Sequence, residues 1–234
     1  MSDFDREYEI ALNVIIATNE SGDVVVVNTG PEPDDLARLN DLWAAGVSPR
    51  CQLSIETPFE EHLKSLGLGF SDVDVVLVTP LQAYTVGNLP LFQNARIGIL
   101  RSGWEFFFDT RYKPHPHDYP PNVFPPRVLN YLIYEAHDRL LLLDDNQEIL
   151  PGVSVRFTGG HHRASMGVSF ATGGGEVVAS DSAFVRENLQ PGRVLGIIEN
   201  MYEVLDAYEW FRSVPHFIPL YDPDVAGQYP GGIG

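Results

Sequence analysis

Short apolar runs and helical periods alternate along this chain, separated by turn-forming residues. Residues 73–78 (VDVVLV) are almost uninterruptedly apolar, which is typical of a strand covered on both faces. Residues 8–17 (YEIALNVIIA) and 24–27 (VVVV) are apolar and β-branched, and the turn-rich NESGD between them predicts a hairpin. Similar runs predict further strands at residues 96–100, 140–143, 153–158, 166–171, 177–180 and 216–221.

Helical periods lie between these strands. Residues 34–45 carry leucines and a tryptophan at helical spacing behind an acidic first turn, which predicts an amphipathic helix. The TPFE at residues 57–60 has the form of a capping box with proline at the first helical position, so we expect a helix from there to about Leu66. Further helices are predicted from Trp104 and over residues 127–136 and 201–212. The interleaved pattern indicates an α/β or α+β domain.

Residues 109–126 (DTRYKPHPHDYPPNVFPP) interrupt this alternation. Their prolines exclude regular structure, and a long irregular segment inside a compact domain is typical of a lid or binding loop. His115 and His117 lie on it, and they either contact a bound substrate or are incidental surface histidines. The aromatic residues in and before this segment could also supply a homodimer surface.

Length and composition suit a single domain over residues 1–234, with the lid inserted in it. The chain has 234 residues, 44% of them apolar, and no low-complexity linker divides it. One cysteine, Cys51, excludes an internal disulfide and suits a reducing compartment. The acidic start MSDFDREYEI lacks the basic and apolar regions of a signal peptide, and no apolar run approaches the ~20 residues of a membrane span. We therefore expect a cytoplasmic protein.

The formal net charge is −17, which disfavours nucleic acid and anionic membranes as partners because phosphate groups would be repelled. A small molecule remains the expected ligand. The charge does not identify that molecule, since an acidic surface also serves solubility.

Polar side chains follow several predicted strands, where catalytic groups are commonly held. The strand at residues 73–78 must end at Thr79-Pro80, since proline cannot donate to a ladder. The segments at the ends of the other predicted strands are Asn28-Thr29-Gly30, GGHHRA at residues 159–164, Asp181, and Tyr221-Asp222-Pro223.

Taken in chain order, these segments at the strand ends resemble sequence motifs of the metallo-β-lactamase superfamily. The segment EILPGV at residues 148–153 resembles the corresponding segment of its N-acyl homoserine lactonase-like branch. In that family a buried strand leads into T-H-x-H-x-D-H and a glycine. Thr79 and Gly87 match that motif, and His161 and Asp181 stand at two further ligand places. The other five ligand places hold Pro80, Gln82, Tyr84, Thr85 and Tyr221.

The resemblance implies a four-layer αββα sandwich of two mixed sheets and a hydrolase. It also implies a metal site, but two retained ligands are too few to hold zinc tightly, since catalytic zinc takes three or more protein ligands. We therefore expect no dizinc centre, and at most one weakly bound divalent ion at His161 and Asp181.

Three interpretations remain open. In the first, His161 and Asp181 hold a different metal with help from His162, Gln82, Tyr84, Tyr221 or the lid histidines. In the second, the site works without metal: His161 or His162 is the general base, Asp181 orients it, and Tyr84 or Tyr221 stabilises the oxyanion. In the third, the chain is an inactive pseudoenzyme that binds a small ligand or a protein partner.

We favour a remodelled hydrolase site for a small ester, lactone or cyclic amide, because the replacements at Gln82, Tyr84 and Tyr221 are all polar. Arg163, next to the histidine pair, would either anchor a substrate carboxylate or form a surface ion pair.

Overall fold

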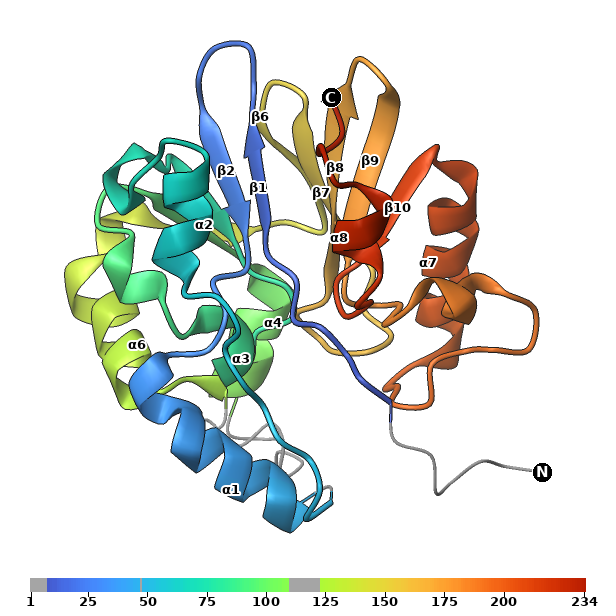
Figure 1. The fold of residues 1–234 in the computed structure, drawn as a ribbon, viewed down its shortest axis with the longest axis horizontal. Coiled ribbons are helices and arrows are strands. Elements are labelled where there is room, and N and C mark those ends of the chain that lie inside the picture. Colours follow the sequence, from blue (N-terminus) through green and yellow to red (C-terminus); the bar gives the residue numbers. More distant parts are fainter. Residues whose placement is uncertain (1–7, 47, 110–122) are drawn as a thin grey trace.

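The protein is built of four layers, with helices on the outside and two β-sheets face to face between them (Figure 1). The computed structural model describes residues 8–46, 48–109 and 123–234. Both sheets have five strands and both mix parallel with antiparallel pairs. The expected αββα sandwich of two mixed sheets is confirmed.

The first sheet has the strand order β1-β2-β3-β4-β5. Its first pair is an antiparallel hairpin, and the remaining neighbours are parallel. Val25 pairs with Val75, so that the strand predicted at residues 73–78 lies at the centre of the sheet. The strands are β1 (Ile15–Thr18), β2 (Val24–Val27), β3 (Val75–Leu77), β4 (Arg96–Leu100) and β5 (Leu140–Leu143).

The second sheet has the order β10-β9-β8-β7-β6. It is an antiparallel meander, to which the last strand of the chain adds in parallel beside β9. The strands are β6 (Asn146–Leu150), β7 (Val153–Phe157), β8 (Met166–Thr172), β9 (Gly175–Ser180) and β10 (His216–Pro219).

Within the described residues, three apolar clusters join the layers. The central one lies between the sheets and contains Val27 and Leu77 from the first sheet and Val168 from the second. A second cluster joins the first sheet to helices on its outer face, and a third joins the second sheet to α7. The helices are α1 (Leu36–Gly46), α2 (Phe59–Ser65), α3 (Ala83–Val86), α4 (Arg101–Phe108), α6 (Pro126–Asn130), α7 (Met201–Ser213) and α8 (Val225–Gln228).

Two local predictions were wrong. The first strand begins at Ile15 rather than residue 8, because the backbone N–H groups of Ala11 and Asn13 donate instead to the carbonyls of Tyr221 and Leu220. The capping box at residues 57–60 does not form: Pro58 occupies the cap position of α2, with no side-chain cap bond.

The helix predicted over residues 127–136 is α6 continued by a π-helical turn, Tyr131–Glu135.

None of the helices in the described part of the chain combines the length and apolarity that a bilayer crossing requires.

Candidate functional site

The candidate site lies where the ends of strands from both sheets meet, and Thr79 joins the two sheets there. Thr79 follows β3, yet its Oγ1 accepts a hydrogen bond from the Met166 N–H at the start of β8 (2.8 Å) and donates to Asp181 after β9. Asn28, which follows β2 with φ 64°, fixes Thr79 from the other side: its amide donates to the Thr79 carbonyl (2.7 Å) and accepts from the Thr79 N–H (2.8 Å). The sheet ends are therefore locked together at this threonine.

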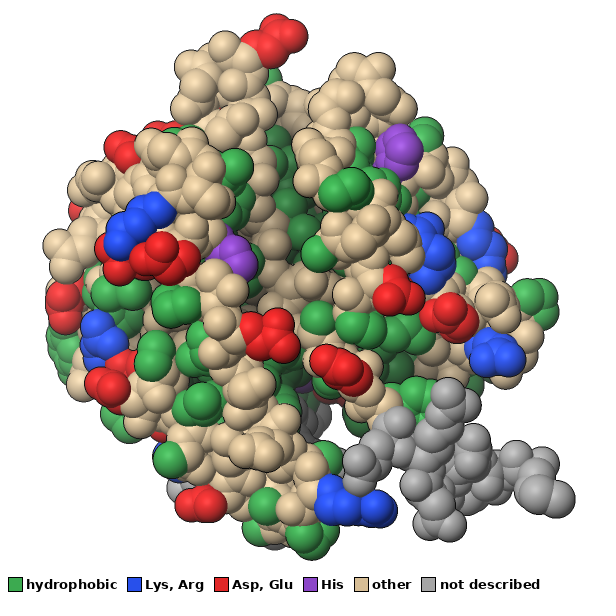
Figure 2. Space-filling model, in the orientation of Figure 1, with side chains coloured by type: hydrophobic (Ala, Val, Ile, Leu, Met, Phe, Trp, Pro, Cys, Tyr) green, Lys and Arg blue, Asp and Glu red, His purple; other side chains and the backbone are tan. Residues whose placement is uncertain are grey.

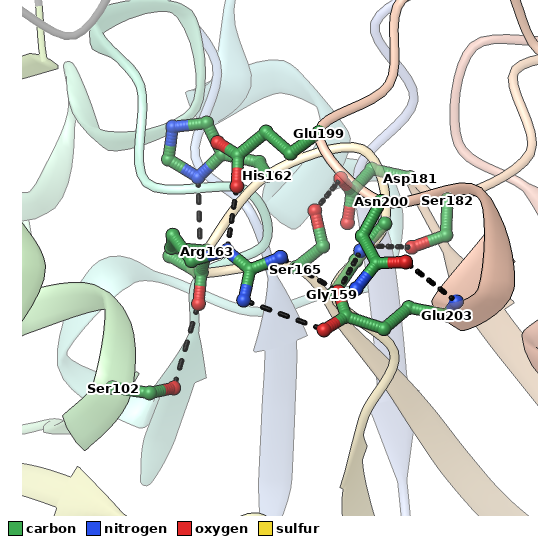
Figure 3. A network of polar contacts seen from close by, with 12 residues as sticks. Ser102, Gly159, His162, Arg163, Ser165, Asp181, Ser182, Glu199, Asn200 and Glu203 are labelled. Atoms are coloured by element: carbon green, nitrogen blue, oxygen red, sulfur yellow. Dashed lines mark hydrogen bonds and ion pairs between the residues drawn. The ribbon is translucent and has the colours of Figure 1, made fainter.

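Asp181 is fully buried beneath this corner. Its two carboxylate oxygens accept from two hydroxyl groups, that of Thr79 and that of Ser165 (2.5 Å), and Figure 3 shows Ser165 turned toward it. A buried carboxylate needs such donors, because it has lost its hydration. Asp181 therefore belongs to a closed polar network below the site.

His162 is buried and hydrogen-bonded at both ring nitrogens. The Ala164 N–H donates to its Nδ1 (3.1 Å), and the Gln82 amide lies 3.0 Å from its Nε2. The atom placed there is the amide nitrogen of Gln82; with Nδ1 accepting, a neutral ring carries its proton on Nε2, so the amide must turn over for its oxygen to accept that proton. Phe107 of α4 stacks on the same ring at 5.1 Å. These contacts suit His162 to positioning rather than to proton abstraction.

His161 is held differently. Its Nδ1 lies 3.0 Å from the carbonyl oxygen of Ile197, to which only a protonated nitrogen can donate, so Nε2 of the neutral ring is a base. Burial lowers the pKa of His161, and the nearby Asp181 carboxylate opposes that shift without cancelling it. A neutral imidazole at pH 7 is the form that can accept a proton.

Tyr84 and Tyr221 meet although they come from opposite halves of the chain. Their hydroxyl groups lie 3.3 Å apart, with the Tyr221 O–H donating. Burial raises the pKa of Tyr221 well above its usual value, and the neighbouring Tyr84 and Asp181 add to the shift. Tyr221 therefore keeps its proton and can act as a hydrogen-bond donor, not as a phenolate.

Arg163 faces two glutamates at the start of α7. Its Nε lies 2.5 Å from Glu199 and its Nη2 lies 2.7 Å from Glu203. Figure 3 marks contacts of Arg163 with both glutamates. The Gly160 N–H donates to the same Glu203 carboxylate (2.8 Å), so the glutamate binds the loop that carries both histidines. Arg163 thus forms an ion pair, and anchoring a substrate carboxylate would require it to exchange these partners.

Two predicted histidines cannot be placed, and two residues of the site were not predicted. His115 and His117 lie outside the described residues. Phe184, which the sequence analysis did not single out, contacts both His161 (4.9 Å between ring centroids) and Tyr221 (4.7 Å). Nothing in the sequence marks this phenylalanine, since its role depends on which distant rings surround it. Ser165 was also missed, although it follows the histidine pair closely.

Two surface hollows do not coincide with this site. One of about 390 Å³ lies on the second sheet, beside Ser154, Ser169 and Glu176, and one of about 440 Å³ lies beside Arg156 and Trp210. The face shown in Figure 2 is also hollowed along its middle, between the parts that hold the two sheets. Neither of the two measured hollows is lined by His161, Asp181 or Tyr221.

The side chains at this corner fit a zinc pair poorly. Both oxygens of Asp181 and both ring nitrogens of His162 lie within hydrogen-bond distance of protein groups. Tyr221 is protonated, whereas metal ligands must be deprotonated. In the described ranges, no three His, Cys, Asp or Glu side chains come together in a way that could hold a metal ion.

Of three comparisons with known proteins, only the one with solved structures gives matches. No protein-family model matches the sequence, and no curated protein does. Among solved structures, the chain is similar to an N-acyl homoserine lactone hydrolase whose product, N-hexanoyl-L-homoserine, is bound at its catalytic metal centre. The TM-score is 0.69 at 17% identity, covering 96% of this chain and 87% of the other.

Two further structures agree. The dizinc quorum-quenching lactonase AidC gives a TM-score of 0.59 at 14% identity, over 86% of this chain and 67% of its own. A candidate metallo-β-lactamase of Thermotoga maritima gives 0.55 at 17% identity, over 89% and 87%. The chain therefore has the metallo-β-lactamase fold. Within that fold, it is similar to structures of N-acyl homoserine lactone hydrolases.

Proposed function

We propose that this protein is a hydrolase that acts on a small ester, lactone or cyclic amide, at a site remodelled so that it has no dizinc centre. The observation that carries this proposal is the orientation of His161. Its Nδ1 is tied to the Ile197 carbonyl, so its Nε2 is available as a base, and Phe184 contacts both its ring and that of Tyr221, which donates to Tyr84. The likeness to lactone hydrolases of the same fold supports the choice of substrate class.

In the reaction that these groups would support, Nε2 of His161 takes a proton from water as the oxygen attacks the carbonyl carbon. A phenolic O–H of the Tyr84–Tyr221 pair donates to the developing oxyanion. When the tetrahedral intermediate collapses, the imidazolium returns its proton to the leaving oxygen or nitrogen. The products are a carboxylic acid and an alcohol or amine, so atoms and charges balance.

The other polar groups would act through His161 and the phenols. Gln82 holds His162, whose ring centroid lies 6.4 Å from that of His161, and the negative charge of Asp181 stabilises the imidazolium that forms at His161. General base catalysis of this kind contributes roughly 10²- to 10⁴-fold, which is less than a zinc-bound hydroxide supplies. A modest turnover number is therefore expected.

A binding protein without catalysis is the alternative. It is favoured by the closed hydrogen bonding of His162 and Asp181, which leaves these two groups fewer bonds to offer a reacting substrate. In that case a ligand would stabilise the fold and be recovered unchanged.

The deciding experiment measures hydrolysis of a panel of esters, γ-lactones and cyclic amides, with and without added Zn²⁺, Mn²⁺ or Fe²⁺. His161→Gln should abolish turnover, and Tyr84→Phe should reduce it. The matched control is His62→Gln, which changes an exposed histidine on α2 and should leave turnover intact. Turnover that survives in His161→Gln would refute the assignment of the base. The hydrolase proposal fails if no member of the panel is consumed under any of these conditions.

A further inference from the structure

Aromatic rings from five separate segments form a continuous series around the candidate site. Trp43 of α1 contacts Tyr84 (5.7 Å between centroids), and Tyr84 contacts Tyr221 (6.2 Å). Phe184 joins Tyr221 to His161, and each of its contacts with them is edge-to-face. Four of the five rings are partly exposed, and Tyr221 alone is buried. The series is therefore only partly covered and is not simply interior packing.

In the described part of the chain, the charged groups that act on these rings are mostly negative. Asp181 lies close enough to His161 and Tyr221 to influence both, and Glu199 also acts on His161. Among the described residues, Arg163 is already paired with two of the carboxylates of this region, Glu199 and Glu203. Arg186, close in sequence to Phe184, directs its guanidinium to the Phe217 carbonyl and the Tyr229 hydroxyl instead.

Negative charge combined with partly exposed aromatic residues favours organic cations. The face of an aromatic ring carries negative charge density, and a substituted ammonium within about 6 Å of Trp or Tyr is attracted by it. An anionic ligand would meet these carboxylates, and in the described part of the chain Arg163 beside them is already engaged in ion pairs. A neutral ligand would gain only the apolar contact.

We propose that the wall formed by Trp43, Tyr84, Phe184 and His161 binds the substituted ammonium group of a small organic cation. This inference names the charge class of the ligand at the proposed hydrolase site and rests on that site. The natural substrate would then be an ester, lactone or cyclic amide that also carries an amine, protonated or quaternary. Because binding precedes chemistry, the inference can be tested without any turnover.

The test uses two probes of nearly identical shape: choline, and its neutral isostere 3,3-dimethylbutan-1-ol. Their affinities are measured by isothermal titration calorimetry in buffer with about 0.5 M KCl, which screens general attraction to the acidic surface. Choline should bind about tenfold more tightly than the alcohol, as a cation–π contribution predicts. Tyr84→Leu should remove this preference, whereas the matched variant Tyr84→Phe should keep it, since it retains the ring.

Phe184→Leu provides a second variant if Tyr84→Leu does not fold, and circular dichroism with the thermal midpoint checks both. Three results would overturn the inference: equal affinity for the two probes, no binding of either probe, or a preference for choline that survives in both leucine variants. Choline binding in a protein that hydrolyses nothing would refute the hydrolase proposal and keep the inference. Turnover of neutral esters without any preference for choline would support the hydrolase proposal and refute the inference about the cation.

Discussion

The guanidinium of Arg163 donates to both carboxylate oxygens of Glu203, with Nη2–Oε2 and Nη1–Oε1 distances of 2.7 Å and 3.4 Å. This pair connects the loop between β7 and β8 to the first turn of α7. The backbone reinforces it, since the Glu199 N–H donates to the Gly160 carbonyl (2.6 Å). The position of the histidine pair is therefore set by α7 as much as by the sheet.

Arg163→Ala should lower the free energy of unfolding by about 1–3 kcal/mol, because it leaves two partly buried carboxylates without their shared cation. Urea denaturation followed by circular dichroism measures this. The control is Arg101→Ala, which breaks the more exposed pair with Asp144 and should change stability by no more than about 0.5 kcal/mol. An equal decrease in the free energy of unfolding in the two variants would show that the ion pairs of Arg163 stabilise the protein no more than the exposed pair of Arg101 does.

Thr79→Val should cost about 3 kcal/mol of stability at nearly constant volume. The substitution removes one donor from the buried Asp181 carboxylate and leaves the Met166 N–H without its acceptor. Thr57→Val is the matched control: Thr57 is exposed and α2 has no side-chain cap bond, so its unfolding curve should overlay the wild type. If both variants unfold like the wild type, Thr79 does not lock the sheets.

The stability of the protein should depend on pH through His161. Its pKa in the folded state lies below the ordinary value of about 6.5, so the unfolded chain takes up this proton first as the pH falls. The contribution is complete above about pH 6.5 and is lost as the pH drops from there toward the folded-state pKa. Unfolding free energies of the wild type and His161→Gln, measured between pH 5 and 8, give the difference. A difference that does not change with pH would contradict the assignment.

Zinc content gives a separate test of the remodelled site. Protein purified without chelator should contain well under one zinc per chain, since the side chains that meet at this corner are mainly neutral or already hydrogen-bonded. Inductively coupled plasma mass spectrometry measures this, with a dizinc lactonase prepared in parallel as the positive control. Two tightly held zinc ions per chain would show that the ligands have been assigned wrongly.

The sequence by itself determined the local elements and their order. Leu140 to Leu143 is a strand, Met201 begins a helix and Val75 to Leu77 is a central strand, because apolar periodicity reports burial directly. The cap at Thr57 and the start of the first strand were mispredicted. In the first strand, distant backbone groups of Leu220 and Tyr221 took the hydrogen bonds that the local pattern assigned to a neighbour.

Only the tertiary structure decided what the polar residues do. Tyr84 and Tyr221 are 137 positions apart, and their contact exists because α3 and the end of β10 reach the same corner from different sheets. Arg163 could be interpreted as a substrate anchor or as an ion-pair partner until Glu199 and Glu203 were found beside it. Hydrogen bonds and ion pairs depend on distances of a few ångströms between segments that the one-dimensional pattern leaves unrelated, whereas burial is written into the pattern itself.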